Sequence, residues 1–310
     1  MTRKTDELKL DANESAFFAS ELDAVKAQTY DARYPQLKAT QLIPVPTPQD
    51  SGADTITWRG FDRVGQAKIV SDYAKDYPRV DVYGKENRVP VRDIGDSYGY
   101  SLKEIRRAMK AGNNLNARKA LAARQVVETK INKLSWFGDR EWQMQGFINY
   151  PGIQKSVPSG ASASAKKWAG KTAEAILADI QAAITQIVDT TNGVEMPNTM
   201  ILPIAQYNHL AFTPYSTGLQ GETLLAWIKR NYLQLTTIDW VAELKGAGEN
   251  GTDSVMFYTK DETHVTNEIL IPFEQFAPQQ EGLDFKVICQ ATYGGVINYY
   301  PMATIQVDGI

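Results

Sequence analysis

The feature that most constrains the fold of this chain is a continuous helical pattern from about Leu115 to Trp136. Its apolar residues recur three or four positions apart, so a helix would place them in one narrow stripe. The stripe consists of Ala120, Ala123, Val127, Ile131 and Leu134. Gly138 follows the pattern where a C-cap is expected, and further glycines occur at Gly146 and Gly152. A long rod with a glycine-rich exit is typical of a scaffold rather than of a catalytic centre.

Length and composition are those of a folded, soluble protein. The 310 residues are enough for one large domain or two smaller domains that share a core. No apolar run approaches the roughly 18 residues that a membrane span needs, and the first ten residues lack the apolar segment of a secretory signal. We therefore expect a cytoplasmic protein without a membrane partner.

Positive charge is concentrated around the predicted rod. Residues 101–136 contain nine basic and two acidic residues, a local balance of +7, whereas the whole chain carries a net charge of −3. This distribution predicts that Arg118, Lys119 and Arg124 face a polyanion or an acidic neighbouring subunit. A solvated helix face is the alternative.

The N-terminal residues 1–54 have the pattern of an extended arm. A helix is expected over Asn13 to Ala27, and prolines then disrupt regular structure because they lack an amide donor. An arm of this kind has few contacts of its own and normally gains them from another surface, often that of a neighbouring subunit. The predicted contact residues in the arm are Pro44, Pro46 and Pro48.

Short strand patterns fill residues 55–100. Runs from Ile56 to Phe61, from Ala67 to Val70, from Val80 to Tyr83 and from Val89 to Ile94 are typical of β-structure. The polar segment Gly84 to Arg88 is predicted to be the charged tip of a projecting hairpin. Because such a hairpin is too small to be stable alone, its tip residues are expected to pack on another surface. They are Lys85, Glu86, Asn87 and Arg88.

The remaining residues predict alternating helices and strands. Ser101 and Glu104 form a capping box at a helix start. A Ser-, Ala- and Gly-rich loop is expected over residues 156–170, followed by an amphipathic helix from Thr172 to Asp189. Further predicted segments are a helix over 222–232 and strands over 199–203, 238–243, 254–258, 268–271, 284–290 and 303–307.

No residue set predicts a catalytic, cofactor or metal site. Gly170, Lys171 and Thr172 match the end of a phosphate loop, but Ala165 replaces the required glycine and no buried strand precedes them. Thr172 is better explained as a helix N-cap. His209 and His264 lack partners at metal-ligand spacing, and the single Cys289 lies in an apolar run. The alternative interpretation, a soluble nucleotide-binding enzyme, therefore depends on one incomplete motif.

The order of these elements resembles the major capsid proteins of tailed bacteriophages with the Hong Kong 97-type fold, an α+β class. The resemblance is carried by the order of several short segments over about 55–155. These are Ile56-Thr57-Trp58, Asp62, Gly65-Gln66-Ala67, Tyr98-Gly99-Tyr100-Ser101, Asn114-Leu115-Asn116, Lys119 to Arg124, Gly138 and Gly146-Phe147-Ile148-Asn149.

The resemblance implies a division of the chain and a function. The implied parts are an N-terminal arm (1–54), an extended hairpin loop (55–100), a peripheral domain with a long spine helix (101–203), an axial domain (204–300) and a C-terminal strand returning to the peripheral domain (301–310). The implied function is self-assembly into hexamers and pentamers of an icosahedral head enclosing double-stranded DNA. In such a shell the arm and the hairpin, with its tip Lys85 to Arg88, reach neighbouring subunits. Scaffolding, portal and decoration proteins are implied partners, and the location is the virion, with assembly in the host cytoplasm.

An encapsulin nanocompartment has the same fold and is a close alternative. An encapsulin usually begins with a short amphipathic helix that binds cargo, so the proline-rich arm favours the viral interpretation. One departure is the absence of a long, charged, coiled-coil-like scaffolding segment before the arm.

Overall fold

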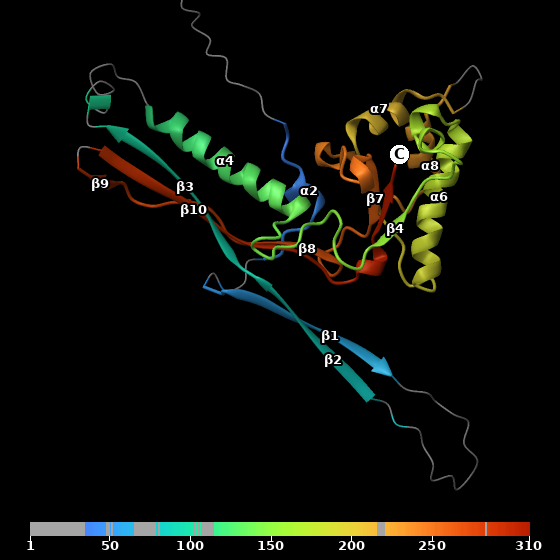
Figure 1. Cartoon of the computed structure of the whole chain (residues 1–310), viewed down its shortest axis with the longest axis horizontal. Coiled ribbons are helices and arrows are strands. Elements are labelled where there is room, and N and C mark those ends of the chain that lie inside the picture. Colours follow the sequence, from blue (N-terminus) through green and yellow to red (C-terminus); the bar gives the residue numbers. More distant parts are fainter. Residues whose placement is uncertain are drawn as a thin grey trace, which may run out of the picture. The chain divides into compact units, whose positions relative to one another are not determined.

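Two β-sheets and a separate two-stranded ribbon organise the chain (Figure 1). One sheet has the strand order β3–β10–β8, with the short strand β9 paired to β10, and the other has the order β4–β11–β7–β5–β6. Strands β1 and β2 form the ribbon. All of these elements belong to Leu37–Ile310, which packs as one unit.

This structure is a computed structural model. The residues that it describes are 35–47, 50, 52–64, 79, 81–101, 103, 104, 106, 115–215, 221–282 and 284–310, without the side chains of 62–64 and 115–118. The helix expected over Asn13 to Ala27 and the strand expected over Ala67 to Val70 lie outside these ranges.

The first sheet is antiparallel and packs against the long helix α4 (Leu115–Phe137). Its strands are β3 (Arg92–Ser101), β8 (Val265–Gln275), β9 (Gln279–Glu281) and β10 (Asp284–Asn298). Val127, Ile131 and Leu134 of α4 form a buried cluster with Ala291 and Tyr293 of β10. The predicted apolar stripe of the rod is therefore confirmed, and the sheet is its partner.

Helix α4 ends where two glycines allow the chain to pass very close to itself. Gly138 has a φ of +66°, and a Cβ atom there would lie 2.3 Å from the carbonyl oxygen of Met144. A Cβ atom at Gly146 would lie 2.2 Å from the amide nitrogen of Gly138. The predicted C-cap is confirmed, and both positions exclude a side chain because its first carbon would overlap the backbone.

Three helices share a core with the second sheet. Its strands are β4 (Gln154–Ser156), β5 (Thr199–Leu202), β6 (Thr237–Trp240), β7 (Ser254–Tyr258) and β11 (Ile305–Asp308). The helices are α6 (Ala173–Thr190), α7 (Ile204–Phe212) and α8 (Leu224–Asn231). In α6 the buried face includes Ile176, Ile180 and Ile187, as the sequence predicted, and Thr172 caps the first turn by accepting from the amide of Ala175 at 3.4 Å.

The predicted loop over 156–170 is partly wrong. It contains helix α5 (Ala163–Lys166) and a 3-10 helix (Trp168–Gly170), and the Trp168 side chain is buried. Its indole Nε1 donates to Asp179 at 3.2 Å, and Lys171 forms a buried ion pair with the same carboxylate. Lys171 is thus paired inside the fold instead of being exposed as in a phosphate loop.

The elements around each of the two sheets come from both of the predicted ranges, 101–203 and 204–300. Helix α6 packs on the second sheet and not on α4, while β8 and β10 pack on α4. The C-terminal strand β11 lies between β4, to which it is parallel, and β7, to which it is antiparallel. The named domain division stays a prediction, and the packing favours one group around α4 and another around the second sheet.

Residues 37–47 differ from the expected extended arm with few contacts of its own. They include helix α2 (Ala39–Leu42), and Leu42 and Ile43 are buried in a cluster with Trp136 of α4. The Lys38 Nζ atom lies 2.7 Å from Asp239. This part of the arm packs against its own subunit because its apolar side chains fill the end of the core.

Candidate subunit-contact surfaces

The ribbon is a longer hairpin than the sequence predicted. Strand β1 (Thr55–Val64) pairs antiparallel with β2 (Asp81–Pro90) along its whole length. Lys85 pairs with Gly60, and Arg88 pairs with Thr57. The prediction that Lys85, Glu86, Asn87 and Arg88 form the tip was therefore wrong, because these polar residues lie within a strand and pair with Thr57–Gly60 of the preceding strand.

One face of the ribbon root is held by the rest of the same subunit. Val89 is buried, and the rings of Trp58 and Tyr299 meet edge to face with centroids 6.0 Å apart. Ile56 packs against Gly294 of β10. A Cβ atom added to Gly294 would lie 2.7 Å from the Ile56 Cδ1 atom. These contacts fix where the ribbon leaves the core.

The opposite face carries a cluster of charges. Because paired residues in antiparallel strands share a face, Arg59, Glu86 and Arg88 point the same way. Arg88 Nε donates to Glu86 at 2.9 Å, and Arg59 Nε does so at 3.4 Å. The Arg88 guanidinium, and then that of Arg59, holds the pKa of Glu86 below its usual range. Exposed pairs of this kind add little stability, so we expect the cluster to matter for recognition.

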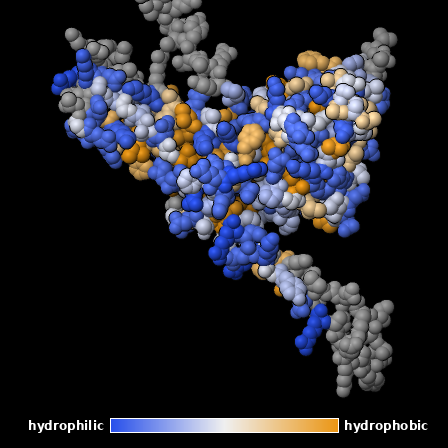
Figure 2. All heavy atoms as spheres, in the orientation of Figure 1, coloured by the Kyte–Doolittle hydropathy of each residue, from blue (hydrophilic) through white to orange (hydrophobic). Residues whose placement is uncertain are grey.

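Apolar side chains on the same face of the ribbon are open to solvent. Phe61 is 68% exposed and Val82 is 58% exposed. Figure 2 shows hydrophilic and hydrophobic residues side by side along the described part of the ribbon. Large apolar groups this exposed on a two-stranded element make the ribbon a candidate contact surface.

A groove of about 460 Å³ lies between α4 and β3. Its apolar lining residues are Ile94, Val126, Val127, Leu134, Trp142 and Met144, and its charged ones are Arg92, Asp93, Asp96, Lys130 and Asp139. The Arg92 guanidinium lies 5.6 Å from the centre of the Trp142 ring. Sequence reasoning missed this groove because its walls come from segments that are 30 or more residues apart.

The predicted proline contacts have different surroundings. Pro44 and Pro46 are half-buried, and the carbonyl oxygen of Pro44 accepts from the amide of Asn267 at 2.8 Å. Pro48 lies outside the described residues. Whether any of the three meets a neighbouring subunit stays a prediction.

Two of the three predicted polyanion contacts are engaged within the subunit. Lys119 Nζ donates to the carbonyl oxygen of Gly99 at 2.8 Å and lies 4.3 Å from the centre of the Tyr100 ring. Arg124 Nε lies 2.7 Å from Glu128, one turn along α4. The side chain of Arg118 lies outside the description. The capping box is confirmed, since the Glu104 amide donates to Ser101 Oγ at 3.2 Å.

No catalytic constellation emerges from the described residues. Among them, no group of three or more His, Cys, Asp or Glu side chains has the geometry of a metal site. Burial raises the pKa of the Cys289 thiol, which makes it a poor nucleophile. None of the helices in the described ranges combines the length and apolar character that crossing a membrane requires.

Comparison with known proteins identifies the family. A family model described as major capsid protein matches residues 65–310. The chain belongs to the major capsid protein family. Members of this family are structural proteins from which capsids are built, in agreement with the resemblance inferred from the sequence. A comparison with curated protein sequences found no match.

Solved capsids share the fold. This capsid protein is similar to the capsid of Myoviridae phage XM1, with a TM-score of 0.80 and 18% identity over 94% of this chain and 98% of that one. For Gordonia phage Cozz the TM-score is 0.59, with 12% identity over 99% of both chains. For the virus-like particle of Pyrococcus furiosus it is 0.55, with 16% identity over 86% of this chain and 91% of that one. The predicted α+β capsid fold is therefore confirmed.

Proposed function

We propose that this capsid protein forms the icosahedral head of a tailed bacteriophage. Copies of the chain assemble into hexamers and pentamers, which close around double-stranded DNA. Family membership and the similarity to the phage XM1 capsid over nearly the whole chain support this proposal. Enclosed DNA would distinguish it from the nanocompartment alternative, whose shell holds protein cargo.

Contacts between subunits are proposed to involve the ribbon β1–β2 and the residues before Leu37. The ribbon is fixed at its root by Trp58 and Val89, and its opposite face presents Phe61 and Val82. A closed shell repeats each contact many times, so contacts that are individually weak can give a stable particle. Scaffolding, portal and decoration proteins are further proposed partners, with assembly in the host cytoplasm before the protein resides in the virion.

The observation that carries the proposal is the exposed apolar face of the ribbon. We expect Phe61→Ser combined with Val82→Ser to prevent closed shells, because the double variant removes apolar area that the proposed subunit contact would bury. The melting temperature of the unassembled subunit should stay within about 2 °C of the wild type, since both side chains are exposed.

Electron microscopy and calorimetry of the same preparations check this. Trp58→Ser is the contrasting variant, because it removes a contact within the subunit and should lower the melting temperature. Normal shells from the Phe61 and Val82 double variant would contradict the proposed contact.

A further inference from the structure

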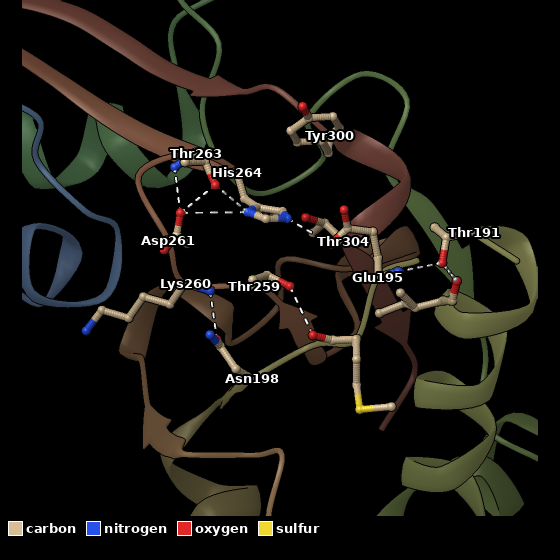
Figure 3. Close-up of polar contacts among 12 residues, drawn as sticks. Thr191, Glu195, Asn198, Thr259, Lys260, Asp261, Thr263, His264, Tyr300 and Thr304 are labelled. Carbon is tan, nitrogen blue, oxygen red and sulfur yellow. Dashed lines mark hydrogen bonds and ion pairs between the residues drawn. The ribbon is translucent and has the colours of Figure 1, made fainter. Parts of the chain in front are cut away.

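Two connections that cross between the sheets meet at His264 (Figure 3). Residues 259–264 lead from β7 in the second sheet to β8 in the first, and residues 299–304 lead back from β10 to β11. The carbonyl oxygen of His264 accepts from the amide of Tyr299 at 2.8 Å. The His264 and Tyr300 rings have centroids 5.3 Å apart. His264 therefore contacts both crossings.

A third segment, the loop 191–198 after α6, is attached at the same place. The Glu195 Oε2 atom lies 2.8 Å from His264 Nε2, and both side chains are about four-fifths buried. Beside this pair, the Lys260 amide donates to Asn198 Oδ1 at 2.7 Å. The pair thus joins α6 to the junction between the sheets.

An oxygen atom lies within hydrogen-bond distance of each ring nitrogen of His264. The Thr263 hydroxyl and amide both donate to Asp261 Oδ1, and this hydrogen bonding lowers the pKa of Asp261, so Asp261 is an acceptor. A hydroxyl has a single hydrogen, so the Thr263 oxygen is left to accept from His264 Nδ1, 3.0 Å away. Glu195 Oε2 is in turn placed to accept from Nε2. Each ring nitrogen of His264 therefore faces an oxygen that can accept a hydrogen bond.

We propose that His264 is held as an imidazolium between Glu195 and Asp261 and acts as a proton-dependent clamp at the junction of the two sheets. Asp261 Oδ1 lies 3.9 Å from Nδ1. The Tyr300 ring faces the imidazole from the other crossing, whereas the Lys260 side chain points away (Figure 3).

Loss of a proton would weaken the clamp. A neutral ring has only one N–H, so either the Glu195 contact or the Thr263 contact would lose its hydrogen. The clamp is therefore closed at low pH and loosens as rising pH removes the proton. Its consequence is a subunit whose two sheets are held together more firmly in acid than in alkaline solution.

The clamp predicts how the melting temperature of the full chain depends on pH. His264→Gln should lower it by about 3 °C or more at pH 5.5, because charge-assisted hydrogen bonds are lost. The difference from the wild type should become smaller as the pH is raised to 8.5, since loss of the proton removes one of the two N–H donors. Glu195→Gln should show the same trend, whereas Glu262→Gln, an equal charge change at an exposed neighbour, should not.

A spectroscopic measurement on the unmutated chain complements the melting series. The chain has two histidines, so His264→Gln assigns the ring ¹⁵N signals of His264 against those of His209. Both ring nitrogens of His264 should be bonded to hydrogen at pH 6. A neutral ring at that pH, or a His264→Gln loss of equal size at pH 5.5 and 8.5, would overturn the proposal.

Discussion

At the scale of single residues, the turn after α4 requires two residues without side chains, Gly138 and Gly146. Gly138 and Gly146 face each other across a gap that no Cβ atom fits, which lets Phe147 donate its amide to the carbonyl oxygen of Ser135 at 2.8 Å. The chain can then turn sharply into the second sheet. The sequence predicted the cap at Gly138, but the role of Gly146 depends on a contact eight residues away, which local patterns do not encode.

We expect Gly146→Ala to lower the free energy of unfolding by about 2 kcal/mol or more, because the added carbon would overlap the backbone of Gly138. Urea unfolding of the soluble subunit measures this. Gly170→Ala is the matched control, since a Cβ atom there has no neighbour within 4 Å. Equal stability of the two variants would show that the close approach is not required.

At the scale of elements, helices were predicted better than the ribbon. The spacing of Ile176, Ile180 and Ile187 determines a buried helix face by itself, and α6 follows it. Strand β2 has no such signal, because Lys85, Glu86 and their polar neighbours are as typical of a turn as of an exposed strand. Its conformation comes from pairing with β1, a partner that is distant in the sequence.

The basic residues of α4 are proposed to contact packaged DNA. Lys119 donates to the backbone of β3, so its substitution could change the stability of the subunit as well as its contacts. The ion pair of Arg124 with Glu128 is exposed, so its loss should cost little stability. We expect Arg118→Glu combined with Arg124→Glu to reduce the DNA retained in assembled heads, because two favourable charges become repulsive. The amount of DNA per particle, measured from absorbance at 260 and 280 nm, checks this prediction. Lys166→Glu with Lys167→Glu reverses the same charge on another surface, and equal DNA content in all particles would contradict a DNA-facing α4.

At the scale of the whole molecule, the structure changes where the arm is expected to end. Lys38, Leu42 and Ile43 are buried in their own subunit, so a deletion through Pro48 would damage the core. The residues before Leu37 are the part proposed to reach a neighbour. The family could be inferred from the order of elements, whereas the packing of α6 away from α4 could not, because it depends on which sheet β11 joins.

Electron microscopy of the expressed full chain tests the central claim most directly, alongside a chain that begins at Leu37. The account predicts closed polyhedral particles tens of nanometres across from the full chain. It predicts folded subunits without closed shells from the shortened chain, because the buried contacts of residues 38–43 are kept. A full chain that remains a uniform monomer under all assembly conditions would contradict the account.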